Sequence, residues 1–144
     1  MTASSQLPPF HLALPVADID AARHFYGEVL GFPRGRSDER WTDWNVDGHQ
    51  VVTHQVDNHT RAVAGTNSVD GHQVPVPHFG LVLSVEHFQQ LAKRLTDASV
   101  EFVIEPYVRF AGEPGEQWTM FFLDPSGNAL EFKAFRDPSQ LFAV

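Results

Sequence analysis

The chain has no cysteine among its 144 residues. Disulfides, thiolate metal sites, iron–sulfur clusters and a cysteine nucleophile are therefore excluded together. Positive charge is also scarce, because ten Lys and Arg stand against eighteen Asp and Glu, for a formal net charge of −8 at pH 7. Nucleic acids and anionic membrane surfaces bind to clusters of positive charge, so we expect neither as a partner.

Long hydrophobic runs are missing as well. No stretch of the chain approaches the roughly 20 apolar residues of a membrane span. Residues 1–9 have neither the basic start nor the apolar run of a signal peptide, so we expect a cytoplasmic protein. With 42% hydrophobic and 19% charged residues, the composition is that of one folded domain, residues 1–144, rather than of a disordered chain.

Histidine, in contrast, is abundant. Imidazole is the commonest metal ligand in proteins and the usual acid or base near neutral pH. Because cysteine is absent, any metal site in this chain must use nitrogen and oxygen ligands. The eight histidines are His11, His24, His49, His54, His59, His72, His78 and His87.

The first half of the chain shows the pattern of a strand, a helix and further strands. Asp18 is a candidate N-cap for an amphipathic helix whose apolar positions recur at helical spacing as far as Gly31. Asp47 and Gly48 form a dipeptide typical of tight hairpins. The expected strands span residues 10–16, 32–36, 41–46 and 50–56.

From His78 the second half of the chain repeats the same order of strand, helix and further strands. Residues 57–77 carry many turn residues and no apolar periodicity, so we interpret them as a connection. Ser84 is the candidate N-cap of a second amphipathic helix, and residues 124–127, Asp-Pro-Ser-Gly, form a strong turn signal. The expected strands span residues 78–84, 101–105, 117–123 and 128–135.

The two halves also match where they begin. Residues 11–14 and 78–81 share the order His, apolar, small, Leu, and each opens a strand that leads into an amphipathic helix. We therefore predict an α+β fold of two βαβββ modules in tandem. Module one spans about 8–58, the connection about 57–77, module two about 78–136 and a C-terminal tail 137–144.

The faces of the predicted strands single out three candidate metal ligands. Side chains two apart in a strand share a face, so His11 and His78 point away from the helix side of their strands. Glu131 and Lys133 do the same in the last strand. If the modules enclose a shared cavity, His11, His78 and Glu131 converge on it, in the 2-His-1-carboxylate arrangement of non-haem Fe(II) oxygenases. Taken singly, each histidine is more simply explained as a surface or hydrogen-bonded residue, and Glu131 as a solvated strand position; the coincidence of all three in face and position favours the metal site.

Three segments resemble the vicinal oxygen chelate superfamily, which includes glyoxalase I, fosfomycin- and bleomycin-resistance proteins and extradiol dioxygenases. They are residues 10–32 with the motif F-Y-x-x-V-L-G-F, the strand from His78, and residues 124–132 with the motif D-P-x-G-x-x-x-E-F. The resemblance implies curved mixed sheets that enclose a metal-binding cavity, a small-molecule substrate and a homodimer. By position it makes His11, His78 and Glu131 the metal ligands.

The number of ligands distinguishes the chemistries of this superfamily. Glyoxalase-type members add a fourth ligand from the last strand of module one, whereas ring-cleaving dioxygenases use three. Overlaying Gly48 on Gly127 places Val52, which cannot bind a metal, opposite Glu131. His54 is a candidate fourth ligand if the register differs, and otherwise a general base. Three ligands favour an extradiol-dioxygenase-like oxidoreductase with Fe(II), while Mn, Zn or Ni remain alternatives.

One residue departs from the ring-cleaving pattern. Those members commonly carry Tyr on the strand before the D-P-x-G turn, where this chain has Phe121. Tyr107 and Arg109 are therefore candidates to orient the substrate, since a phenol and a guanidinium both donate hydrogen bonds to an anionic oxygen. The alternative is a packed aromatic residue and a surface strand residue.

Two other functions stay open at this point. One is a glyoxalase-like lyase or isomerase that acts on a dicarbonyl substrate, with Zn²⁺, Ni²⁺ or Mn²⁺ as Lewis acid. The other is a ligand-sequestering protein of the bleomycin-resistance kind, which needs a cavity but no metal. The intact His/His/Glu set argues against the second.

Overall fold

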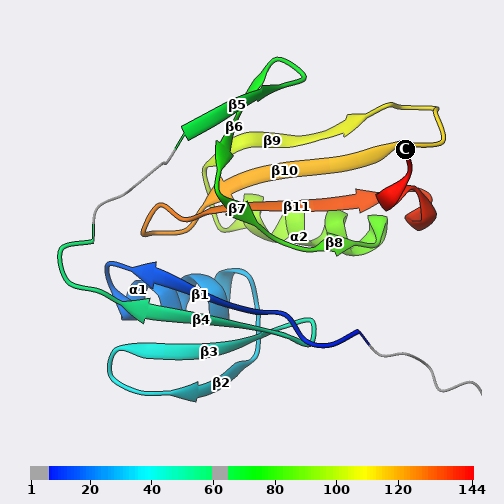
Figure 1. Cartoon of the computed structure of the whole chain (residues 1–144). Helices are drawn as coiled ribbons and strands as arrows, with labels where there is room; N and C mark the ends of the chain where they lie inside the picture. The colour runs from blue at the N-terminus through cyan, green and yellow to red at the C-terminus, as the bar shows by residue number, and fades with distance from the viewer. Residues whose placement is uncertain (1–6, 60–64) are drawn as a thin grey trace, which may run out of the picture. The chain divides into compact units, whose positions relative to one another are not determined.

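The computed structural model describes residues 7–59 and 65–144, which form two compact units, residues 1–59 and 60–144 (Figure 1). The first unit has its elements in the order βαβββ, and the second repeats this order after a β-hairpin, with the first strand split in two and a short 3₁₀-helix after the last strand. The predicted α+β class and the tandem arrangement of two modules are confirmed. None of the helices in these described ranges is long and apolar enough to cross a membrane.

The first unit is a four-stranded sheet with strand order β1-β4-β3-β2, in which β1 and β4 are parallel and the other pairs antiparallel. Asp18 caps the helix as predicted, since its carboxylate accepts hydrogen bonds from two backbone N–H groups. The elements are β1 (His11–Val16), α1 (Ile19–Arg23), η1 (His24–Val29), β2 (Arg34–Ser37), β3 (Trp41–Val46) and β4 (His49–Gln55).

The helix of the first unit differs from the expected continuous α-helix. Only α1 is α-helical, and η1 is a π-helix. The wider π-turn changes which positions face the sheet, so the consecutive Phe25 and Tyr26 are both buried. Gly27 lies against Trp44, where a Cβ atom would approach the indole ring to 3.2 Å. Apolar spacing alone does not distinguish this turn from an α-helical one.

The second unit is a mixed sheet with strand order β7-β11-β10-β9, and β8 also pairs with β11. Both β7 and β8 run parallel to β11, while β10 is antiparallel to its two neighbours. Ser84 caps α2 as predicted, with its Oγ accepting from the backbone N–H of His87 at 3.1 Å. The elements are β7 (His78–Phe79), β8 (Val82–Leu83), α2 (Val85–Asp97), β9 (Phe102–Arg109), β10 (Gln117–Leu123), β11 (Ala129–Phe135) and η2 (Pro138–Phe142).

A hairpin occupies the segment that we interpreted as a connection. It consists of β5 (Gly65–Val69) and β6 (His72–Val76), and Asp70 and Gly71 at its turn both have positive φ. Val74 is buried against Ile104 and Phe121, which anchors the hairpin on the second sheet. The strands escaped the sequence analysis because most of their side chains are polar and exposed, so they show no apolar alternation.

The core of the first unit contains a buried hydrogen bond between two side chains, and its loss gives a test of the fold. Trp44 is 1% exposed and its Nε1 donates to Thr53 Oγ1 at 3.1 Å. We expect Thr53→Val to lower the free energy of unfolding by about 1–3 kcal/mol, because it leaves a buried indole N–H unpaired. Urea unfolding measures the loss. As a control, Thr96→Val on α2, where the hydroxyl is exposed and bonds only to its own helix, should change stability by less than about 0.5 kcal/mol; equal losses would contradict the prediction.

Candidate functional site

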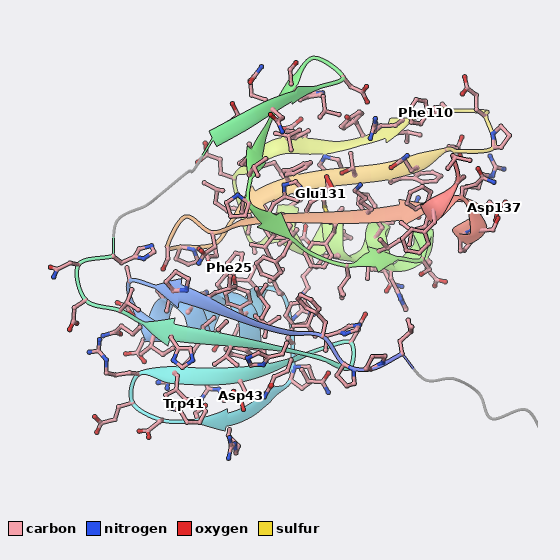
Figure 2. The ribbon with its side chains drawn as sticks, viewed as in Figure 1. Phe25, Trp41, Asp43, Phe110, Glu131 and Asp137 are labelled. Atoms are coloured by element: carbon pink, nitrogen blue, oxygen red, sulfur yellow. The ribbon has the colours of Figure 1, made fainter. Side chains whose placement is uncertain are left out.

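His78 and Glu131 lie together in the second unit. His78 begins β7 and pairs with Ala129 of β11, so Glu131 lies two residues farther along the neighbouring strand (Figure 2). Its neighbours Leu130 and Phe132 are buried in the core, which directs Glu131 to the opposite face of the sheet. His78 Nε2 is 3.9 Å from Glu131 Oε1, and the carboxylate is only 11% exposed. The structure thus brings together two of the three predicted ligands.

The imidazole of His78 is oriented from two sides. Its Nδ1 lies 2.6 Å from the backbone carbonyl oxygen of Pro75. Because a carbonyl oxygen only accepts, Nδ1 carries a hydrogen and donates it, and Nε2 is the ring nitrogen that faces Glu131. The ring of Phe121 meets the imidazole edge-on, with centroids 5.0 Å apart. Phe121, which has no hydroxyl to donate, therefore packs its phenyl ring against the histidine.

The two oxygens of Glu131 have different surroundings. The hydroxyl of the buried Thr119 donates to Oε2 at 3.2 Å. Oε1, which faces His78, also lies 3.2 Å from Lys133 Nζ. One oxygen is thus fixed by a buried hydroxyl and the other faces two nitrogen groups. The sequence analysis placed Lys133 on the face of Glu131 without a role, and it missed Thr119, which only the pairing of β10 with β11 brings to this position.

A glycine lets the two strands approach at the site. Gly80 lies between β7 and β8, and a Cβ atom there would be only 1.6 Å from the carbonyl oxygen of Glu131. The next residue, Leu81, accepts a hydrogen bond from Lys133 N at 3.0 Å. A residue with a side chain at position 80 would force this backbone away from β11. The predicted strand 78–84 is accordingly split into two short strands around this point.

His11 belongs to the first unit, where it begins β1. It pairs with Gln50 of β4, and its Nδ1 lies 2.7 Å from Gln50 Oε1. His78 begins β7 and pairs with β11 in the same parallel manner, so the two histidines occupy equivalent positions in their modules. In residues 7–59 and 65–144 no three His, Asp or Glu side chains gather closely enough to hold a metal ion.

The strand registers also define which residues of the first module correspond to Glu131 and Lys133 of the second. β1 pairs His11 with Gln50 and Pro15 with His54, while the second module pairs His78 with Ala129 and Val82 with Lys133. Val52 therefore stands where the second module has Glu131. His54 stands where the second module has Lys133; it is exposed, and its ring lies 6.4 Å from that of Trp41.

Tyr107 and Arg109 on β9 both contact the β5–β6 hairpin. Tyr107 packs against His72, with ring centroids 5.0 Å apart, and Arg109 Nε forms a salt bridge with Asp70. Burial raises the pKa of Tyr107 above its ordinary value, although the charge of Arg109 opposes this. Tyr107 is therefore a neutral phenol near pH 7, able to donate a hydrogen bond. It pairs with Thr119 across the sheet, next to the carboxylate of Glu131.

The first unit has an open pocket of about 480 Å³ on its helix side. Acidic and basic side chains both line it, so it has no strong preference for either charge. None of the predicted site residues contributes to it. The lining residues are Asp20, Arg23, His24, Gly27, Glu28, Phe32, Arg34 and Trp44.

The family model of the Glyoxalase/Bleomycin resistance protein/Dioxygenase superfamily matches residues 9–132. The chain belongs to this superfamily. A crystal structure of a glyoxalase/bleomycin resistance protein/dioxygenase from Alicyclobacillus acidocaldarius is 31% identical and has a TM-score of 0.77, with 99% of this chain and 100% of that one covered. The resemblance to the vicinal oxygen chelate superfamily, its other name, is thereby confirmed.

More distant members of the superfamily share the fold. The fosfomycin resistance protein FosX from Listeria monocytogenes is 16% identical with a TM-score of 0.68, covering 96% of this chain and 100% of that one. A glyoxalase/dioxygenase from Nostoc punctiforme is 16% identical with a TM-score of 0.65, covering 94% of this chain and 100% of that one. At this identity the likeness shows the fold alone. Among curated proteins, none matches the chain.

The close approach at Gly80 predicts that alanine substitutions at two glycines of the second unit will differ sharply in their effect on stability. Gly80→Ala should lower the free energy of unfolding by about 1–3 kcal/mol or more, because its Cβ collides with the backbone of Glu131. Gly115→Ala is the matched control, since a Cβ there meets nothing within 4 Å. Urea unfolding of both variants is the measurement. Equal stabilities would show that β7 and β8 can move away from β11 at little cost.

The environment of Tyr107 predicts its behaviour at high pH. Because burial raises its pKa above the ordinary value of 10.0, the folded state favours the neutral phenol. That contribution to stability is present below pH 10 and is lost as pH rises through the folded-state pKa. The ultraviolet difference titration of wild type minus Tyr107→Phe isolates this phenol from Tyr26. We expect its midpoint above 10; a midpoint at or below that value would contradict the assignment.

Proposed function

We propose that the chain is a divalent-metal-dependent enzyme in which His11, His78 and Glu131 hold the metal ion. The observation that carries the proposal is the His78–Glu131 pair, with Nε2 and Oε1 facing each other at 3.9 Å. A hydrogen bond from Nδ1 to a backbone carbonyl and a hydrogen bond to the carboxylate are the supports that metal ligands commonly have in proteins. The donor set therefore fits a divalent ion. The equivalent position of His11 in module one supports it as the third ligand.

The superfamily includes many metal-dependent enzymes and also resistance proteins, and we propose that this member is an extradiol-dioxygenase-like oxidoreductase. A small aromatic substrate with vicinal oxygens is the proposed ligand. Val52 stands at the position of Glu131 in module one, which favours three protein ligands over the four of glyoxalase-type members. When bound, Fe(II) would offer open coordination positions to the substrate oxygens and to O₂. Mn, Zn and Ni are accepted by the same donor types.

The residues around the pair have distinct proposed roles. Thr119 holds Oε2 of Glu131, so that the carboxylate presents Oε1. Tyr107 donates a hydrogen bond to an anionic substrate oxygen. Arg109 has two guanidinium nitrogens besides the Nε that binds Asp70, and with these it assists Tyr107. His54 is the proposed acceptor of the substrate's proton, because an imidazole can act as a general base.

The assembly and location of the chain complete the proposal. Members of the superfamily bind small-molecule substrates and often form dimers, and we propose a homodimer in the cytoplasm. A ligand-sequestering protein would have no use for an imidazole whose Nε2 is held toward a carboxylate. A glyoxalase-like lyase or isomerase would use the same ligands without consuming O₂, so the experiment must separate these reactions.

Metal content and O₂ uptake test the proposal together. Protein purified anaerobically should contain iron by elemental analysis and should consume O₂ with members of a panel of catechols. His11→Ala, His78→Ala and Glu131→Gln should each lose the metal, because each removes one donor. His87→Ala, on α2, is the control and should keep it. Retention of metal by His78→Ala would refute the site, and another metal without O₂ uptake would favour the lyase or isomerase.

A further inference from the structure

The two lysines of the chain have contrasting surroundings. Lys93 lies on α2 with its side chain 77% exposed and forms an ion pair with Asp97, also on the surface. Lys133 on β11 is 33% exposed, and its Nζ lies 3.2 Å from Oε1 of Glu131. Of the two lysines, only Lys133 therefore places its ammonium group beside a proposed metal ligand.

The ammonium group of Lys133 forms an ion pair with Oε1 of Glu131, the oxygen that would bind a metal ion. Oε2 of Glu131 accepts from Thr119, whereas Oε1 faces both His78 and Lys133. A divalent ion between Nε2 and Oε1 would therefore share this oxygen with a second cation. Two cations bound to the same carboxylate oxygen repel each other strongly in a partly buried site. The flexible stem of Lys133 allows its ammonium group to leave Oε1 while it stays on the same face of the sheet.

We propose that Lys133 is a specificity-determining residue that binds an anionic substituent of the metal-bound substrate, and this inference rests on the proposed function. The substrate class is then a vicinal-oxygen compound that carries a carboxylate or similar oxyanion. With a divalent ion bound, the single negative charge of Glu131 no longer balances the positive charges beside it. The positive charge of Arg109, in contrast, is already balanced by the carboxylate of Asp70.

The neighbouring strands supply further donors for this substituent. Lys133, Thr119 and Tyr107 form one row across β11, β10 and β9. The phenol of Tyr107 is protonated near neutral pH and stands at the end of this row. An oxyanion above the row would meet an ammonium group at one end and a phenol donor at the other. Module one has His54 in place of Lys133, so the lysine is a feature of the second module alone.

Two ligands with the same chelating oxygens test the inference. Protein loaded with redox-inert Zn²⁺ is titrated by calorimetry with 3,4-dihydroxybenzoate and with its neutral analogue 4-methylcatechol. Wild type should bind the carboxylate compound about tenfold or more tightly, as expected for one charge-assisted hydrogen bond. Lys133→Met should lose this preference, Lys133→Arg should retain it, and the control Lys93→Met should behave as wild type. A preserved preference in Lys133→Met would overturn the inference.

Metal binding, measured without substrate, separates this inference from the proposed function. Removal of a competing cation should leave the Zn²⁺ affinity of Lys133→Met equal to that of wild type or higher. If wild type binds no metal at all, the proposed function fails, and the inference fails with it. If wild type binds metal but both catechols bind equally, only the inference fails.

A direct view of the lysine comes from isotopic labelling. Reductive methylation with ¹³C-formaldehyde labels both lysines, and Lys133→Met identifies the resonance that belongs to Lys133. That resonance should shift when Zn²⁺ is added and shift again with 3,4-dihydroxybenzoate, while the Lys93 resonance stays in place. A Lys133 resonance that is unmoved by both additions would overturn the inference.

Discussion

The contact between Gly80 and the backbone of Glu131 is the constraint on which the candidate site depends. Only a residue without a side chain can lie so close to that carbonyl group. The contact holds β7 and β8 in parallel pairing with β11 and so brings the imidazole of His78 to the carboxylate. The carbonyl of Pro75, in β6, accepts the Nδ1 hydrogen of that imidazole and so orients it.

Much of this site could be predicted from the sequence, because alternation along a strand is a local property. The alternation places His78, Glu131 and Lys133 on the face away from the helix. Asp18 and Ser84 could likewise be predicted as the N-caps of the two helices. What depends on pairing between strands could not be predicted in the same way. The hydroxyl of Thr119 reaches Glu131 only through the register of β10 against β11. The hairpin β5–β6 has only two buried residues, Val74 and Pro75, and the apolar spacing in the sequence does not reveal that residues 24–29 form a π-helix.

The registers of the two modules show that equivalent positions in a duplicated unit can carry different candidate ligands. Equivalent positions hold His11 and His78, so the imidazole is common to both modules. Val52 occupies the position of Glu131, and its apolar side chain is buried in the first unit. The carboxylate and its counter-charge are thus confined to the second module. Such a division leaves fewer protein ligands than two complete copies would provide, and open coordination positions are what a substrate-binding metal requires.

The charges around Glu131 explain how the second module tolerates a carboxylate that is only 11% exposed. A buried charge without partners would be strongly destabilising. Thr119 and Lys133 satisfy the two oxygens from within the chain, so the fold does not need a metal ion to neutralise the site. This differs from small structural zinc domains, in which metal binding supplies the free energy of folding. In the enzyme that we propose, a metal ion that the fold does not need could be selected for its chemistry, and displacement of Lys133 from Glu131 would make its ammonium group available to the substrate.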